Sequence, residues 1–145
     1  MLALIQRVTS ASVCIEEKIT ASINSGLLIL CGFESGDTLS NALKLLEKCF
    51  RYRIFSDDNN KMNLGLLEIE GSALLVPQFT LVADTKRGLR PSFSKGMPPN
   101  KGKELFNQLI SELSSVYPLT KFGQFGADMK INLCNDGPVT FMLEG

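Results

Sequence analysis

Histidine is absent from the 145-residue sequence. It is the usual general base for a serine or cysteine nucleophile and the commonest transition-metal ligand. Its absence excludes the ordinary serine–histidine and cysteine–histidine mechanisms, and we expect neither a metal site nor a cofactor. If the protein is a hydrolase, it must stabilise its transition state in another way.

Closely spaced cysteines are also lacking. Cys14, Cys31, Cys49 and Cys134 are widely scattered, and three of them lie in apolar segments. No zinc or redox spacing results. We interpret the four as reduced thiols that pack as small apolar side chains, with a catalytic thiol or a metal site as the alternatives.

The sequence has no excess of either charge, with 15 basic and 15 acidic residues. The molecule as a whole therefore lacks the electrostatic footprint of a nucleic-acid-binding protein, and no DNA partner is expected. No apolar run reaches the ~18 to 20 residues of a membrane helix, and the N-terminus lacks a secretory pattern. We expect a cytoplasmic protein without a membrane partner, folded as a single domain over residues 1–145.

Periodicity predicts an α+β (mixed α/β) fold. Apolar residues at helical spacing predict one helix over residues 39–50, capped by Asp37 or Thr38, and a second helix after the loop 85–102. Strands are predicted at residues 2–8, 11–17, 19–25, 26–33, 51–55, 127–134 and 138–143, and as a pair within 66–84 that is joined around Glu70-Gly71. We expect a layered, mostly antiparallel, barrel-like sheet with two main helices.

The segment "LLVPQFTLVAD", residues 74–84, carries polar side chains inside an apolar run. Strand alternation would place Gln78 and Thr80 on one face. Pro77 cannot donate a ladder hydrogen bond, so the strand is predicted to be an edge strand or to be interrupted there. The segment then forms either an open face with backbone N–H groups beside an amide and a hydroxyl, or a polar face that merely meets solvent.

Two further segments have unusual backbone or charge. In "NDGPVT", residues 135–140, the Gly137-Pro138 bond can be cis at little cost, and carbonyls fixed that way could grip a small ammonium; a plain turn is the alternative. The region from Asp84 to Lys103 could hold phosphates or form a solvated loop. Its basic residues are Lys86, Arg87, Arg90, Lys95, Lys101 and Lys103.

Six segments, taken in order, resemble the D-aminoacyl-tRNA deacylases, formerly called D-tyrosyl-tRNA deacylases, over essentially the whole chain. They are "IQRVTSASV" (5–13), "GLLILCGFESGDT" (26–38), "RIFSDDNNKMN" (53–63), "PQFTLVADTKRGLRPSF" (77–93), "FGADM" (125–129) and "NDGPVT" (135–140). Several ordered matches are far more specific than any single motif.

The resemblance implies hydrolysis of the ester between a D-amino acid, or glycine mischarged on tRNA(Ala), and the terminal adenosine of a tRNA. It also implies a homodimer with the active site at its interface. There the cis Gly137-Pro138 step of one subunit enters the partner's pocket, turns its carbonyls toward the substrate's α-amino group and excludes the side chain of an L-residue.

The resemblance assigns three groups of residues. The catalytic residues are Gln78, Phe79 and Thr80, with N–H donors at Phe79 and Thr80 stabilising the oxyanion. The Thr80 hydroxyl positions the substrate or, alternatively, acts as nucleophile. Substrate binding and chiral selectivity are assigned to Gly137, Pro138, Asn135, Arg7 and Met129, and tRNA contacts to Lys86, Arg87 and Arg90.

Pro77 departs from the serine that is common in the family. A related branch with relaxed chirality, which removes L-alanine from mischarged tRNA, also has proline there but has alanine where this chain has Phe79. We therefore expect the D-specific activity. The alternatives are the relaxed-chirality deacylase, a noncatalytic RNA-end binding module and a cysteine-dependent hydrolase.

Overall fold

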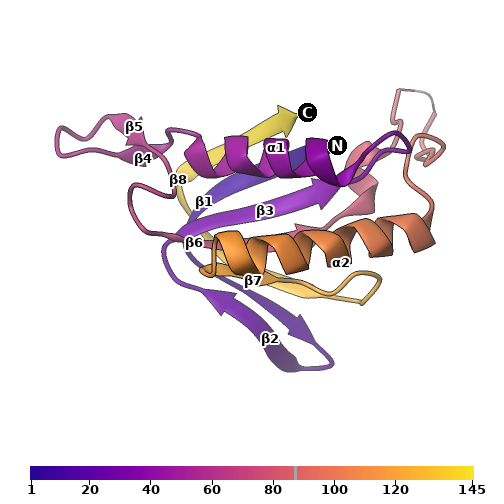
Figure 1. The fold of residues 1–145 in the computed structure, drawn as a ribbon, viewed down its shortest axis with the longest axis horizontal. Coiled ribbons are helices and arrows are strands. Elements are labelled where there is room, and N and C mark those ends of the chain that lie inside the picture. The colour runs from indigo at the N-terminus through magenta and orange to yellow at the C-terminus, as the bar shows by residue number, and fades with distance from the viewer. Residues whose placement is uncertain (87) are drawn as a thin grey trace.

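The computed structural model describes residues 1–86 and 88–145, in which one face of a mixed sheet is covered by two helices (Figure 1). The strands are β1 (Leu2–Ile15), β2 (Lys18–Ile23), β3 (Gly26–Gly32), β4 (Phe55–Ser56), β5 (Met62–Leu64), β6 (Ser72–Pro77), β7 (Thr120–Phe122) and β8 (Lys130–Glu144). The helices are α1 (Leu39–Arg51), α2 (Pro99–Val116) and a 3₁₀ helix (Phe79–Val82). Strand pairing is mostly antiparallel and the sheet is nearly closed, which confirms the predicted α+β class.

One long strand, β1, organises the sheet. The sequence predicted two strands here, but register shifts allow the chain to continue as one. One edge of β1 pairs with β8 along most of its length, and the other pairs first with β3 and then with β2. The β1–β2 hairpin turns at Glu16 and Glu17, which both have positive φ as a tight two-residue hairpin turn requires.

The other half of the sheet is parallel. β3 pairs with β6, and β6 pairs with β7. The strands β3 and β6 are continuous apolar runs that are buried along most of their length, as expected for parallel strands covered on both faces. The short strand β7 was not predicted, because its three residues carry no alternating pattern.

The two helices close the main core. Thr38 caps α1, as predicted, with the backbone N–H of Asn41 donating to its hydroxyl over 3.4 Å and its own N–H donating to Asn41 Oδ1 over 2.8 Å. The helix α2 begins at Pro99, whose missing N–H costs nothing in the first turn. The buried residues of the two helices are Ala42, Leu45, Leu46, Cys49 and Phe50 in α1, and Gly102, Leu105, Phe106, Leu109 and Leu113 in α2.

Three strand predictions are wrong in detail. Residues 51–55 contribute only the start of β4, because α1 extends to Arg51. The first of the two strands predicted within 66–84 is instead a turn, in which Glu70 adopts a positive φ. The two strands predicted at 127–134 and 138–143 form the single strand β8, which bulges where a separate turn was expected.

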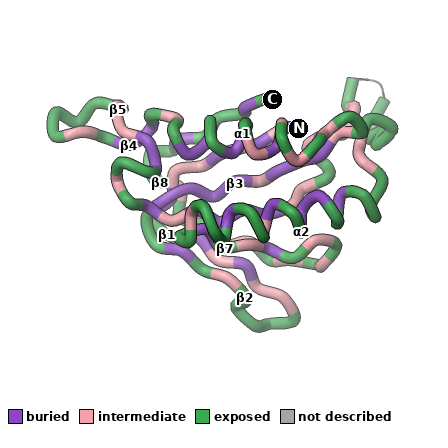
Figure 2. The backbone as a smooth tube through the Cα atoms, viewed as in Figure 1, coloured by how far each residue is buried: buried purple, intermediate pink, exposed green. Residues whose placement is uncertain are grey.

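Burial follows this layering (Figure 2). The central strands and the helix faces that meet them are buried, whereas the β4–β5 arm and the tip of the β1–β2 hairpin are exposed. Neither helix in the described part of the chain combines the length and apolarity needed to cross a bilayer.

Candidate functional site

The residues predicted to be catalytic, Gln78, Phe79 and Thr80, lie at a turn and not on a strand. The strand β6 ends at Pro77, after which the Gln78 N–H still donates to the Cys31 carbonyl over 2.7 Å. The chain then enters the 3₁₀ helix, so strand alternation does not apply to Phe79 and Thr80 and the predicted strand is wrong beyond Pro77. Pro77 thus interrupts the strand, one of the two outcomes predicted, while β6 lies between β3 and β7 rather than at an edge.

The turn brings the polar groups of this segment together. The Gln78 side-chain amide donates to the Thr80 hydroxyl, so the two residues meet although they do not share a strand face. Phe79 and Thr80 occupy the start of a helix, where backbone N–H groups have no intrahelical acceptor. The arrangement presents N–H donors and a held hydroxyl at one exposed corner of the sheet.

An apolar pocket opens beside this corner. Its volume is about 480 Å³. Phe79 is 64% exposed, and its ring packs against Phe93 with a centroid distance of 5.1 Å. The lining residues are Phe33, Pro77, Phe79, Val82, Phe93, Gly96, Met97, Pro98, Pro99, Phe125 and Gly126.

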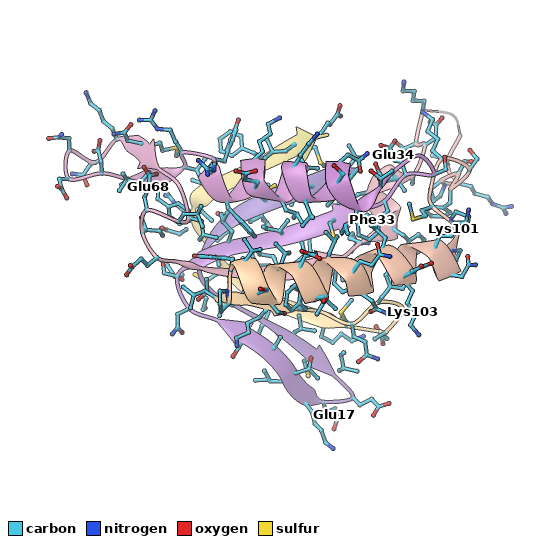
Figure 3. All side chains as sticks on the ribbon, viewed as in Figure 1. Glu17, Phe33, Glu34, Glu68, Lys101 and Lys103 are labelled. Carbon is cyan, nitrogen blue, oxygen red and sulfur yellow. The ribbon has the colours of Figure 1, made fainter. Side chains whose placement is uncertain are left out.

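The wall that Phe125 contributes depends on a glycine in α2. A Cβ at Gly102 would lie 3.0 Å from Phe125 Cζ, so a larger residue there would push the ring away from the helix by a few tenths of an ångström. Figure 3 shows Phe33, another wall residue, at the end of β3. Phe93 and Phe125 lie in segments that carry the family resemblance, but no periodicity links such distant positions, so the pocket was not predicted.

Met129 lies next to this corner rather than in the pocket lining. Its sulfur accepts from the Gln124 N–H over 3.4 Å. A Cβ at Gly123 would lie 3.0 Å from this sulfur and 3.4 Å from Pro77 Cδ, which places both Met129 and Pro77 beside Gly123.

The second part of the site is the Gly-Pro loop, residues 136–139, which bulges from β8. The Gly137-Pro138 peptide bond is cis, the configuration that the resemblance implies. Val139 is buried in the main core and anchors the loop, whereas residues 136–138 are exposed. The Asn135 carboxamide oxygen accepts from the Val139 N–H over 2.7 Å, so the loop is closed by a side chain instead of a ladder bond.

Arg7 holds this loop from β1. Its Nε donates to the Asp136 carbonyl over 2.9 Å, and its Nη1 donates to the Ile54 carbonyl over 2.6 Å. Asp136 Oδ2 also lies 3.3 Å from Arg7 Nε. The guanidinium therefore ties the loop both to β1 and to the segment that follows α1.

The two parts of the site lie apart within one chain. Strand register places Pro77 level with Ala3, whereas the Gly-Pro loop leaves β8 opposite Arg7. Four residues along the strands and three strand spacings across the sheet put the loop on the order of 20 Å from the 3₁₀ helix. One chain alone does not bring Gly137 to Thr80.

The expected tRNA-contacting residues are exposed where they are described. The Lys86 N–H donates to Asp84 Oδ1 over 2.9 Å in an exposed turn, and Arg90 is exposed nearby. Arg87 lies outside the described residues. Lys101 and Lys103 project from the first turns of α2 (Figure 3).

Cys31 and Cys49 are buried, whereas Cys134 is exposed, so the expectation that all four thiols pack as apolar side chains is wrong for Cys134. Burial raises the pKa of the Cys49 thiol to about 12 and also raises the pKa of Cys31, so both stay protonated at neutral pH. Within residues 1–86 and 88–145, no three histidine, cysteine, aspartate or glutamate side chains are grouped as a metal site requires.

Solved structures define the class of fold. The chain superimposes on a structure described as c-Myc DNA Unwinding Element Binding Protein with a TM-score of 0.94 and 33% identity, covering 100% of this chain and 99% of that one. A probable eukaryotic D-amino acid tRNA deacylase superimposes with a TM-score of 0.86 at 14% identity, over 98% and 97% of the two chains, and supports the fold alone.

Sequence comparison identifies the family. A protein-family model described as D-Tyr-tRNA(Tyr) deacylase matches residues 4–144. A D-aminoacyl-tRNA deacylase of Legionella pneumophila is 53% identical and one of Photorhabdus laumondii is 50% identical, each over 99% of both chains. The chain belongs to the D-Tyr-tRNA(Tyr) deacylase family and is a hydrolase.

Proposed function

We propose that this protein hydrolyses the ester between a D-amino acid and the 3′-terminal adenosine of a tRNA in the cytoplasm, and that it acts on glycine mischarged on tRNA(Ala) as well. One observation carries the proposal beyond family membership. Phe79 lines an aromatic pocket of about 480 Å³ and Thr80 follows it in the first turn of the 3₁₀ helix, so a base bound in the pocket would bring an attached ester close to their N–H groups.

The pocket suits the terminal adenine. Unstacked RNA bases are held by stacking on aromatic side chains. Phe79 and Phe93 offer such surfaces, and both rings are substantially exposed. Exposed Lys86 and Arg90, with Arg87 between them in sequence, supply positive charge for the preceding phosphates.

Catalysis proceeds without a side-chain base. Water adds to the ester carbonyl, the developing oxyanion accepts from the Phe79 and Thr80 N–H groups, and the bond from the carbonyl carbon to the ribose oxygen breaks. The ribose oxygen leaves with a proton, and the free amino acid and tRNA are released. The Thr80 hydroxyl, held by Gln78, positions the reacting water and ester instead of attacking.

A second copy of the chain completes the site. The Gly-Pro loop is exposed and lies far from Thr80 of its own chain, and the outer edge of β8 pairs with no strand among residues 1–86 and 88–145. Long unpaired edges of this kind invite a partner. A twofold homodimer can place each loop over the other subunit's 3₁₀ helix.

Chiral selectivity follows from that geometry. The loop carbonyls face the substrate's α-ammonium, and the backbone around Gly137 fills the space that an L side chain would need. Asn135 and Arg7 hold the loop in place, as their hydrogen bonds indicate. Met129, beside Pro77, borders the aminoacyl end of the site.

Pro77 favours one alternative, a deacylase of relaxed chirality that also accepts L-alanyl-tRNA. Its ring lines the pocket where a serine hydroxyl is common in the family. The assay that decides between the activities follows radiolabelled D-tyrosyl-, L-tyrosyl-, glycyl- and L-alanyl-tRNA. The proposed enzyme clears the D-tyrosyl and glycyl esters only; loss of L-alanyl-tRNA identifies the alternative. A noncatalytic RNA-end binding module leaves all four intact.

A further inference from the structure

The neck of the Gly-Pro loop, formed by Asn135 and Thr140, is fixed by side-chain hydrogen bonds, because the backbone hydrogen bonds between β1 and β8 are interrupted there. Two steps along β1, from Gln6 to Val8, face five steps along β8, from Thr140 to Asn135. Three residues are therefore in excess on β8 and leave the sheet. Unpaired residues in a bulge can adopt several directions unless other contacts fix them.

The contacts that fix this bulge meet at one hydroxyl. Thr140 Oγ1 accepts from Asn135 Nδ2 over 3.0 Å and from Gln6 Nε2 over 3.3 Å. Asn135 is held in turn, because its Oδ1 accepts from the Val139 N–H over 2.7 Å. A chain of hydrogen bonds thus runs from β1 across both ends of the bulge.

We infer that Thr140 and Gln6 are positioning residues for enantiomer selection. They act by fixing the neck, and the neck sets the direction in which the Gly-Pro loop leaves the sheet. The inference rests on the proposed function, since it names which residues set the loop that excludes L-aminoacyl groups. Arg7 restrains the loop from one side at Asp136, and the Thr140 hydroxyl restrains it at the opposite end. Loss of the hydroxyl removes the two hydrogen bonds that tie this end of the loop to Asn135 and Gln6, so only the Val139 contacts restrain it there.

The test compares the kcat/KM values for D-tyrosyl- and L-tyrosyl-tRNA under single-turnover conditions with excess full-length protein. Thr140→Val keeps the shape and removes the hydroxyl, and we expect the D-to-L ratio to fall about ten-fold or more, because two hydrogen bonds are lost. Thr140→Ser should keep the ratio within about two-fold of the unmodified protein. Thr9→Val makes the same chemical change at an exposed position of β1 and should leave the ratio unchanged.

Thermal unfolding of each variant shows whether a change in the D-to-L ratio comes from lost selectivity or from lost stability of the fold. A Thr140→Val protein that unfolds earlier but keeps its D-to-L ratio overturns the inference, as does a Thr140→Ser protein that loses the ratio equally. If Thr140→Val does not fold, Gln6→Met removes the donor from β1 to the Thr140 hydroxyl at similar side-chain size, and a fall in the D-to-L ratio is again expected. An unmodified protein that cleaves neither ester contradicts the proposed function itself.

Discussion

Arg7 and Asp136 are joined at two points: Arg7 Nε donates to the Asp136 carbonyl over 2.9 Å and lies 3.3 Å from its carboxylate. The Arg7 side chain is only 12% exposed, so solvent screens this contact less than a surface pair. The contact connects the strand that organises the sheet to the loop proposed to exclude L-aminoacyl groups.

Replacing Arg7 should therefore impair the enzyme. We expect Arg7→Gln to lower kcat/KM for D-tyrosyl-tRNA about ten- to hundred-fold, because hydrogen bonds from a charged group are lost. Arg7→Lys should not restore activity, since an ammonium lacks the fork that reaches two carbonyls. Arg51→Gln is the control, because Arg51 forms an exposed pair with Glu47. Normal activity in Arg7→Gln would remove the loop anchor from the mechanism.

Gly137 should not tolerate a side chain. Its φ is +147°, and an added Cβ would lie 2.5 Å from Val139 Cγ2 and 2.9 Å from the Val139 nitrogen. We expect Gly137→Ala to reduce kcat/KM for D-tyrosyl-tRNA, or the D-to-L ratio, about ten- to hundred-fold through strain in the loop. The matched control is Gly36→Ala, where a Cβ meets nothing within 4 Å. Unchanged kinetics and selectivity in Gly137→Ala would refute this role of the loop.

Variants of Thr80 distinguish a hydroxyl that positions the reactants from one that attacks the ester as a nucleophile. If its hydroxyl only positions the reactants, Thr80→Ala slows single-turnover hydrolysis about ten-fold and leaves measurable activity, while Thr80→Ser restores the rate. Gln78, which holds this hydroxyl, remains in place in both variants. Complete loss in Thr80→Ala with an unchanged unfolding midpoint would indicate a nucleophile instead.

The cysteines should be dispensable for chemistry. Raised pKa values in Cys31 and Cys49, caused by burial, leave these thiols neutral and unreactive at pH 7. A chain with all four cysteines replaced by alanine or serine should keep its kcat, although it will unfold at a lower temperature where buried volume is lost. Iodoacetamide should likewise leave activity intact. Inactivation by either treatment in folded protein would support a thiol mechanism.

Local sequence patterns predicted some helices and strands correctly and missed others, for physical reasons. The helix α1 and its Thr38 cap followed from helical spacing and a capping residue. The residues after Pro77 alternate like a strand, yet proline ends the ladder and a 3₁₀ helix follows. Distant pairing made β8 a single strand, because both halves match β1 across the bulge.

Sequence motifs predicted which residues form the candidate site, but they did not predict how these residues are arranged in space. Gln78 and Thr80 meet as expected, but through a turn instead of a strand face. The pocket joins Phe33, Phe93 and Phe125 from three distant segments, and only the fold brings them together. The distance between the Gly-Pro loop and Thr80 depends on the order and register of β8, β1, β3 and β6. Patterns in a single sequence do not specify that register.

Mixed dimers test most directly whether the loop of one subunit closes the site of the other. One variant carries Gly137→Val and the other carries Gln78→Ala with Thr80→Ala, and each homodimer should be nearly inactive. After denaturation and joint refolding, we expect about a quarter of unmodified activity toward D-tyrosyl-tRNA, since half of randomly paired dimers are mixed and each holds one intact site. A mixture that shows mixed dimers by mass but stays as inactive as its components would contradict the account.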